Sequence, residues 1–166
     1  MPFRSFCTQC LLFVLTICLG IGVIALPAQA ASVDSYVMRY LVKSGEPVSL
    51  SLDGQTQTQF SAEALSQGKR LFEENCKNCH VGGATLPDPL VSLSLSDLKG
   101  ATPPRDNINN LIAYFRHPMV YDGTEETFWC REVPESWMSH AQVEDLAAFI
   151  LRAAEVAPGW GTDRDF

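Results

Sequence analysis

Three stretches of the chain place apolar residues at the spacing of one helix face. The first stretch follows Ser61, a predicted N-cap, and its apolar positions are Leu65, Leu71 and Phe72. Phe60 precedes the cap and Leu65 lies four residues inside the helix, which is the spacing of a hydrophobic staple. The pattern predicts a helix that begins at Ser61 and leads the chain to residue 76.

Two further helices are predicted nearer the C-terminus. The second is expected to be capped by Asp106 and stopped by Pro118, with one buried stripe: Ile108, Leu111, Ile112 and Phe115. The third is expected from about Ser139 to Ala157, with a similar stripe: Val143, Leu146, Ala147 and Ile150. Ser139 and Gln142 have the spacing of a capping box, which marks where this last helix begins.

Alternation of period two is limited to the stretch before Asp53-Gly54. Val48, Leu50 and Leu52 alternate there with polar residues, which predicts a short β-hairpin. The segment after residue 80 is rich in Gly and Pro and leaves little room for a long element. The chain is therefore predicted to be mainly α with much loop. A core of three short helices is small, so a large apolar cofactor at its centre would supply the missing buried surface.

The chain of 166 residues opens on a targeting signal. An apolar run over residues 10–26 follows Arg4 and precedes Ala28-Gln29-Ala30, a small-residue cleavage site. A retained membrane anchor is the alternative, because the run is nearly long enough to span a bilayer. We predict a cleaved signal peptide over residues 1–30, an N-terminal extension with the hairpin over residues 31–60, and one main domain over residues 61–166.

The net charge of the chain after residue 30 limits the kinds of partner that it can bind. Without Arg4, 11 basic residues stand against 19 acidic ones, a net charge of −8. Nucleic-acid binding is excluded because neutralising phosphates requires a basic face. An acidic surface instead favours partners with basic patches. No run after residue 30 is long and apolar enough to span a bilayer, so the predicted mature protein is peripheral to a membrane at most.

The string "CKNCH", Cys76 to His80, is a covalent haem attachment motif. Each cysteine can form a thioether with a haem vinyl group, and the adjacent histidine reaches the iron. A zinc site would need a second ligand pair, and the sequence has no second C-x-x-C. A thiol–disulfide redox pair would follow a strand in an α/β pattern, which is absent. We therefore predict one haem c per chain, bound through Cys76 and Cys79, with His80 as the proximal iron ligand.

The second nitrogen of the His80 imidazole is expected to donate to a backbone carbonyl. The turn at Pro87-Asp88-Pro89 lies at a suitable distance along the chain for this role. The same turn is equally consistent with an ordinary loop turn that has no contact with His80.

Three strings, "CKNCHVGG", "ATPPRDNI" and "YDG", occur in that order and resemble the cytochrome c-550 family, the extrinsic low-potential cytochrome c of photosystem II. The likeness covers about residues 61–160 and extends to the c-550-like paralogue of that family. It implies a class I cytochrome c fold for residues 61–166, a location in the thylakoid lumen and a haem with two histidine ligands.

The chain departs from that family at the second iron ligand. The family's distal histidine follows "YDG" by a few residues, but "YDGTEETFWCREVP" contains no histidine, and Cys130 stands within about one position of the expected place. Cys7, Cys10 and Cys18 leave with the signal peptide, so Cys130 has no cysteine partner outside the motif. A bound iron would explain this lone thiol. Cys130 is therefore the predicted distal ligand.

Other side chains compete with Cys130 for the iron. Met138 precedes the cap of the last helix and is expected to pack on the apolar face, whereas His140 begins that helix and is expected to face solvent. His117 and Met119 lie before the YDG string in the sequence, whereas the distal ligand is expected after it. An open or water-bound iron is the last alternative.

A haem with two axial ligands has no place for a substrate, so the expected chemistry is one-electron exchange rather than enzymatic turnover. We predict an electron-transfer protein of the thylakoid lumen whose partner is the lumenal surface of photosystem II or a soluble redox protein. One alternative is a structural extrinsic subunit that stabilises the oxygen-evolving side of photosystem II. Another is a haem-thiolate redox or gas sensor.

Overall fold

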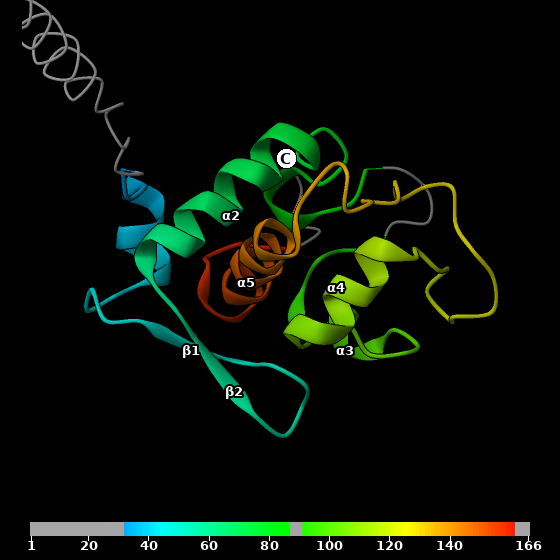
Figure 1. Cartoon of the computed structure of the whole chain (residues 1–166), viewed down its shortest axis with the longest axis horizontal. Coiled ribbons are helices and arrows are strands. Elements are labelled where there is room, and N and C mark those ends of the chain that lie inside the picture. The colour runs from blue at the N-terminus through cyan, green and yellow to red at the C-terminus, as the bar shows by residue number, and fades with distance from the viewer. Residues whose placement is uncertain (1–31, 87–90, 162–166) are drawn as a thin grey trace, which may run out of the picture. The chain divides into compact units, whose positions relative to one another are not determined.

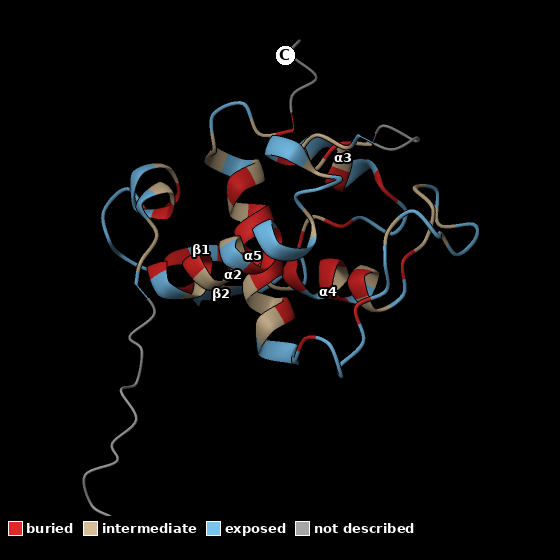
Figure 2. Ribbon diagram, turned by 90° about the horizontal axis from the view of Figure 1, so that it is seen from above, coloured by how far each residue is buried: buried red, intermediate tan, exposed pale blue. Residues whose placement is uncertain are grey.

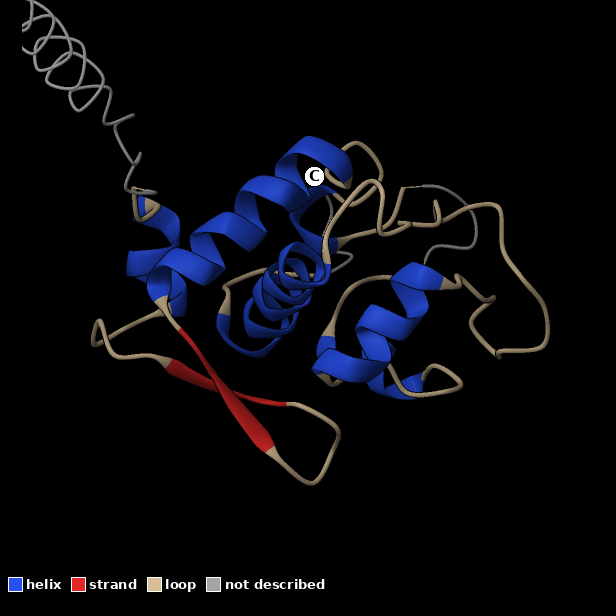
Figure 3. Ribbon diagram, viewed as in Figure 1, coloured by secondary structure: helices blue, strands red, loops and turns tan. Residues whose placement is uncertain are grey.

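A computed structural model describes residues 32–86 and 91–161. The predicted signal peptide over residues 1–30 lies outside the described residues. Helices dominate the described part, and one two-stranded sheet accompanies them, as Figure 3 shows. The elements are η1 (Val37–Leu41), β1 (Val48–Ser51), β2 (Gln57–Phe60), α2 (Ala62–Asn75), η2 (Val81–Gly83), α3 (Leu95–Gly100), α4 (Ile108–Arg116) and α5 (His140–Val156). The predicted mainly α chain with a short N-terminal hairpin is confirmed. Within these residues, no helix has the length and apolar character that crossing a membrane requires.

The core is organised around the crossing of α2 and α5 (Figure 1). A Cβ atom at Gly68 of α2 would lie 1.9 Å from the carbonyl oxygen of Asp145 on α5, so the two backbones touch and only glycine fits. Beside this contact the rings of Phe72, Phe149 and Trp160 pack against one another, with centroids 5.3 to 5.6 Å apart. The crossing fixes the direction in which α2 delivers the haem motif.

Two of the three predicted helix starts are confirmed. The hydroxyl of Ser61 accepts a hydrogen bond from the Ala64 amide, and Ser139 forms the expected capping box with Gln142. The prediction that Asp106 caps α4 is wrong. Asn107 is the cap, and its side chain accepts from the Asn110 amide. Aspartate and asparagine are equally good caps, so the sequence could not decide between two adjacent ones.

The predicted hairpin pairs Val48 with Phe60 in an antiparallel register. Val48, Leu50 and Phe60 are buried, whereas Ser49, Gln57 and Gln59 are exposed. Beyond β1, the Leu52 carbonyl accepts from the Asn109 amide in the first turn of α4, which ties the hairpin to that helix. Figure 2 shows buried residues on α2, α4 and α5, with α5 carrying the longest buried series. The hairpin thus helps to hold α4 against the core.

Candidate haem site

A cavity of about 210 Å³ lies between the end of α2, α4 and the loop after α4. A water molecule takes about 30 Å³ of the liquid, so this space suits a much larger group. Most of the lining is apolar, including Phe72, Leu93, Leu98, Leu111, Phe115 and Ile150. A large apolar cofactor can be buried here.

The haem motif forms one wall of this cavity. Cys76, Cys79 and His80 all line it. The backbone continues α2 by one more turn, in which the Cys79 and His80 amides both donate to the Cys76 carbonyl, at 3.1 and 3.0 Å. This turn brings the two sulfurs and the imidazole to the same space. Burial, together with the nearby thiols of Cys130 and Cys79, raises the pKa of Cys76 to about 12.

The imidazole of His80 is oriented by Thr85. The Nδ1 atom lies 3.0 Å from the Thr85 hydroxyl oxygen, and that hydroxyl donates to the Val91 carbonyl. The oxygen therefore accepts from Nδ1–H, which leaves the lone pair on Nε2 available for iron. Burial lowers the pKa of His80, which favours the neutral ring. The acceptor was expected to be a backbone carbonyl, but it is the Thr85 hydroxyl. The turn suggested for this role, residues 87–89, lies outside the described residues. Thr85 was missed because its contact with His80 forms only when the chain folds back on itself.

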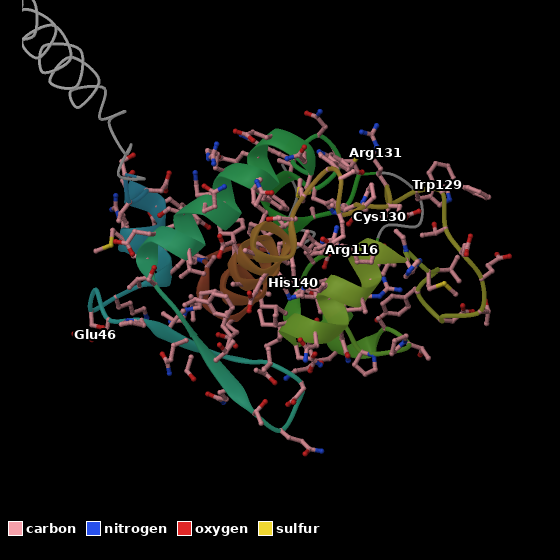
Figure 4. All side chains as sticks on the ribbon, in the orientation of Figure 1. Glu46, Arg116, Trp129, Cys130, Arg131 and His140 are labelled. Carbon is pink, nitrogen blue, oxygen red and sulfur yellow. The ribbon has the colours of Figure 1, made fainter. Side chains whose placement is uncertain are left out.

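The loop between α4 and α5 supplies Cys130, which lines the same cavity as the motif. Burial raises the pKa of the Cys130 thiol, while a hydrogen bond from Tyr114 and the guanidinium of Arg105 act in the opposite direction. Figure 4 shows Cys130 on this loop next to Trp129. Trp129 also lines the cavity, but Phe128 is 98% exposed and points to solvent.

The side chains that compete with Cys130 for the iron differ in whether they line the cavity. Met119 lines the cavity, whereas Met138, His117 and His140 are not among the described residues that do so. Met138 is 2% exposed and belongs to the apolar core, the role expected of it. His140 is exposed in the first turn of α5, and Figure 4 labels it there. The structure therefore brings Cys130 and Met119 to the motif, and not the two alternatives placed near the last helix.

A buried arginine also borders the site. Arg105 is 9% exposed, lines the cavity and donates to the backbone carbonyls of Met119 and Val120. Burial lowers the pKa of this guanidinium. The string "ATPPRDNI" contains Arg105, but nothing in the string shows that its side chain turns inward.

The family model for the cytochrome c-550 domain matches residues 40–166. The chain belongs to the cytochrome c-550 family. A cytochrome c-550-like protein of Thermosynechococcus vestitus is 62% identical over 136 residues, which cover 81% of this chain and 77% of that protein. The photosystem II extrinsic protein V of Gloeobacter violaceus is 54% identical over 136 residues, which cover 81% of this chain and 73% of that protein.

Solved structures agree with this membership. The PsbV2 cytochrome of the cyanobacterium Thermosynechococcus elongatus has a TM-score of 0.76 and 61% sequence identity, covering 79% of this chain and all of that chain. A crystal structure of cytochrome c549 has a TM-score of 0.58 and 30% identity, covering 68% of this chain and 95% of that chain. The resemblance and the cytochrome c fold predicted from the sequence are confirmed.

Membership of the cytochrome c-550 family implies a covalently bound haem c, and the residues present fit that group. Two thiols are available for thioethers, and a neutral imidazole is oriented with Nε2 free. The lining around them is mostly apolar, as burial of a porphyrin requires.

Proposed function

We propose that this chain is a one-electron carrier that binds one haem c through Cys76 and Cys79, with His80 and Cys130 as the two axial ligands of the iron. One observation carries the proposal: Cys130, fifty residues beyond His80 in the sequence, lines the same cavity as the motif. Cys130 forms no disulfide in the described part of the chain, where the other two cysteines belong to the haem motif.

The haem supplies one-electron exchange between ferric and ferrous iron when it is bound. The protein supplies the rest. Thr85 keeps the proton of His80 on Nδ1, and the apolar lining would exclude water from the bound group. If His80 and Cys130 both held the iron, no position would be left for a substrate, which favours electron transfer over catalysis. An anionic sulfur ligand stabilises ferric iron, so the reduction potential is expected below that of a His/Met cytochrome.

The proposed location is the thylakoid lumen, and the proposed partner is the lumenal face of photosystem II or a soluble redox protein. Relatives named photosystem II extrinsic protein V support the association. The acidic composition after residue 30 favours a partner with basic patches. Intact mass of protein from the native host tests the export step. A mature chain beginning near Ala31 supports it, and retention of residues 1–30 contradicts it.

Electron spin resonance of the ferric protein at low temperature tests the proposed ligands, because thiolate ligation has a distinctive low-spin signature. Cys130→Ala should change this signature and raise the potential, and Cys130→His should replace it with that of a haem with two histidine ligands. Met119→Leu is the matched variant at the other sulfur in the cavity and should leave the signature unchanged. A signature that survives Cys130→Ala and disappears in Met119→Leu would assign the distal position to the methionine.

A further inference from the structure

Two adjacent aromatic side chains on the loop between α4 and α5 are exposed to solvent. Phe128 is 98% exposed and Trp129 is 68% exposed. A third aromatic side chain of this loop, Trp137, is less exposed, and the Arg131 guanidinium lies 5.3 Å from the centre of its ring. Single exposed apolar side chains are common on protein surfaces, but adjacent aromatic ones are typical of a surface that binds a partner. Phe128 and Trp129 are here called the aromatic tip.

Trp129 connects the aromatic tip to the haem cavity. Its side chain lines the cavity and is also more than half exposed, so it borders the cavity and the solvent at once. A partner that covers the aromatic tip would be separated from a group in the cavity by this one side chain. Electron transfer slows steeply with the distance between redox groups, so a partner bound here would lie where exchange with the haem is fast.

Carboxylates surround the aromatic tip. Residues 122–137 contain five acidic residues and one basic residue, Arg131, for a net charge of −4, and all six side chains are exposed. Glu126 and Glu125 precede Phe128 by two and three residues. Three residues of chain span at most about 11 Å, which is close to the Debye length of about 8 Å at physiological salt. Both charges therefore act on whatever contacts the aromatic tip.

The combination of apolar surface and negative charge limits what can bind to the aromatic tip. A second copy of this chain would bring the same charge of −4 to the contact, and like charges across an interface oppose binding. Anionic lipid headgroups would be repelled by the same carboxylates. A protein surface with an apolar centre and a rim of lysine and arginine side chains is complementary to both features.

We propose that the aromatic tip is the docking site of a soluble redox protein whose contact surface is apolar at its centre and basic at its rim. Phe128 supplies the apolar contact that becomes buried, and Trp129 brings the partner next to the cavity. Glu125 and Glu126 attract the basic rim and raise the rate of association. This inference rests on the proposed one-electron function, but it does not depend on which residue is the distal ligand of the iron.

The experiment follows electron transfer from the reduced, haem-loaded full chain to a basic cytochrome c whose haem edge is ringed by lysines, by stopped-flow absorbance at several salt concentrations. Phe128→Ser should lower the second-order rate constant about fivefold at every salt concentration, because an apolar anchor of the contact is lost. Glu126→Lys should lower it about threefold at low salt and reduce its dependence on salt, because screening removes the same attraction.

Met38→Ser and Glu46→Lys are the matched controls outside the loop. Met38 is an exposed apolar side chain of η1, and Glu46 is an exposed carboxylate before β1. Neither lines the cavity, and Figure 4 shows Glu46 on the opposite side of the view from Trp129. Both variants should leave the rate constant unchanged. If Glu46→Lys slows transfer as much as Glu126→Lys does, the attraction comes from the charge of the whole chain and the docking site is overturned. Equal losses in Met38→Ser and Phe128→Ser would overturn it as well.

A small uncharged reductant separates this inference from the proposed function. It should reduce the haem of the unmodified chain and of every variant at the same rate, and potentiometric titration should give the same reduction potential for all of them. A haem-loaded chain that exchanges no electron with the reductant would overturn the proposed function, and the docking site with it. Normal exchange with the reductant, together with transfer to the basic cytochrome that neither Phe128→Ser nor Glu126→Lys slows, would overturn the docking site alone.

Other occupants of the aromatic tip are tested with the same Phe128→Ser variant. The unmodified chain should not sediment with phosphatidylcholine vesicles. Sedimentation that Phe128→Ser abolishes would overturn the proposal and assign the aromatic tip to a membrane surface. Photosystem II particles that retain the unmodified chain but release Phe128→Ser, with transfer to the basic cytochrome unchanged, would overturn it in favour of the photosystem.

Discussion

The two sides of the cavity are held in different ways. Residues 76–86 and 91–93, here called the proximal wall, are held mainly by backbone hydrogen bonds among themselves, such as His80 to Cys76 and Leu93 to Gly83. Residues 117–138, the distal loop, are described throughout and contain no helix or strand beyond the single bridge between Met119 and Glu126. Two arginine side chains from outside the loop hold its ends.

This difference indicates where the site can vary. The turns of the proximal wall are closed by backbone hydrogen bonds, so the wall should keep its shape when individual side chains are replaced. The distal loop has some backbone hydrogen bonds of its own, such as Thr127 to Pro118, but its two ends also depend on the side chains of Arg105 and Arg116. The proposed proximal ligand, His80, therefore lies in a short local motif, whereas the proposed distal ligand, Cys130, lies on a loop that also depends on side chains from outside it.

The strongest test of the difference removes the covalent bonds of the proximal wall. Cys76→Ala with Cys79→Ala should abolish haem staining on a denaturing gel, because no thioether can form. Cys130→Ala is the control from the distal loop and should keep the stained band at full intensity. Staining lost in Cys130→Ala would mean that the distal loop is also needed for attachment.

The next largest effect is expected at the helix crossing behind the proximal wall. Gly68→Ala would place a Cβ atom 1.9 Å from the Asp145 carbonyl oxygen, so the helices must separate. The expected loss is about 3 kcal/mol of the free energy of unfolding, at the upper end for overpacking. Gly45→Ala has open space around it but a positive φ of 76°, and it should lose about 1 kcal/mol. Denaturant unfolding of both variants measures the difference, and equal losses would contradict it.

A smaller effect is expected where Arg116 holds the end of the distal loop. Its guanidinium donates to the carbonyls of Val133 and Met138, so Arg116→Ala should cost about 2 kcal/mol. The control is Arg70→Ala, whose ion pair with Glu74 is exposed and should be worth less than about 0.5 kcal/mol. Arg116→Ala should also increase proteolytic cleavage within residues 117–138. An intact loop under limited proteolysis would argue against an anchoring role.

The smallest effect concerns Asp145, on the α5 side of the crossing. Burial, with repulsion from Glu144 added, raises the pKa of Asp145 from 3.8 to about 6. The folded state therefore keeps a proton that the unfolded chain releases, and stability falls as pH rises through that interval. Asp145→Asn should stabilise the protein by about 1 kcal/mol above this interval, allowing for partial solvent screening, and by almost nothing below it. Thermal unfolding at several pH values measures this, and a gain independent of pH would exclude the carboxyl as its cause.

Much of the fold could be predicted because its signals are local. The helix stripes, the Ser61 and Ser139 caps and the hairpin alternation each lie within about ten residues. The helix at Val37–Leu41 was not predicted, because its two buried residues gain their partners only from α2 and α5. The residues around this helix show no clear hydrophobic periodicity.

The residues of the site also differ in whether a local sequence signal predicts them. Cys76, Cys79 and His80 form one contiguous motif. Cys130 was proposed from its position relative to the family's distal histidine and from its lack of a cysteine partner outside the motif. Thr85 and Arg105 carry no such signal, because threonine and arginine side chains are usually exposed. Their roles exist only after the chain has folded.

The last described residues have a consequence for the order of assembly. The Trp160 indole donates to the Leu93 carbonyl, 67 residues earlier, and the Gly161 amide donates to the Gly82 carbonyl at 2.8 Å. The Trp160 ring also fills the space at Gly83, where no side chain would fit. A chain that emerges amino-terminus first exposes Cys76 and Cys79 long before Trp160 follows. The turn at residues 76–80 is therefore synthesised well before the tryptophan that packs beside residues 83 and 93, and that packing can form only after residue 160 has emerged.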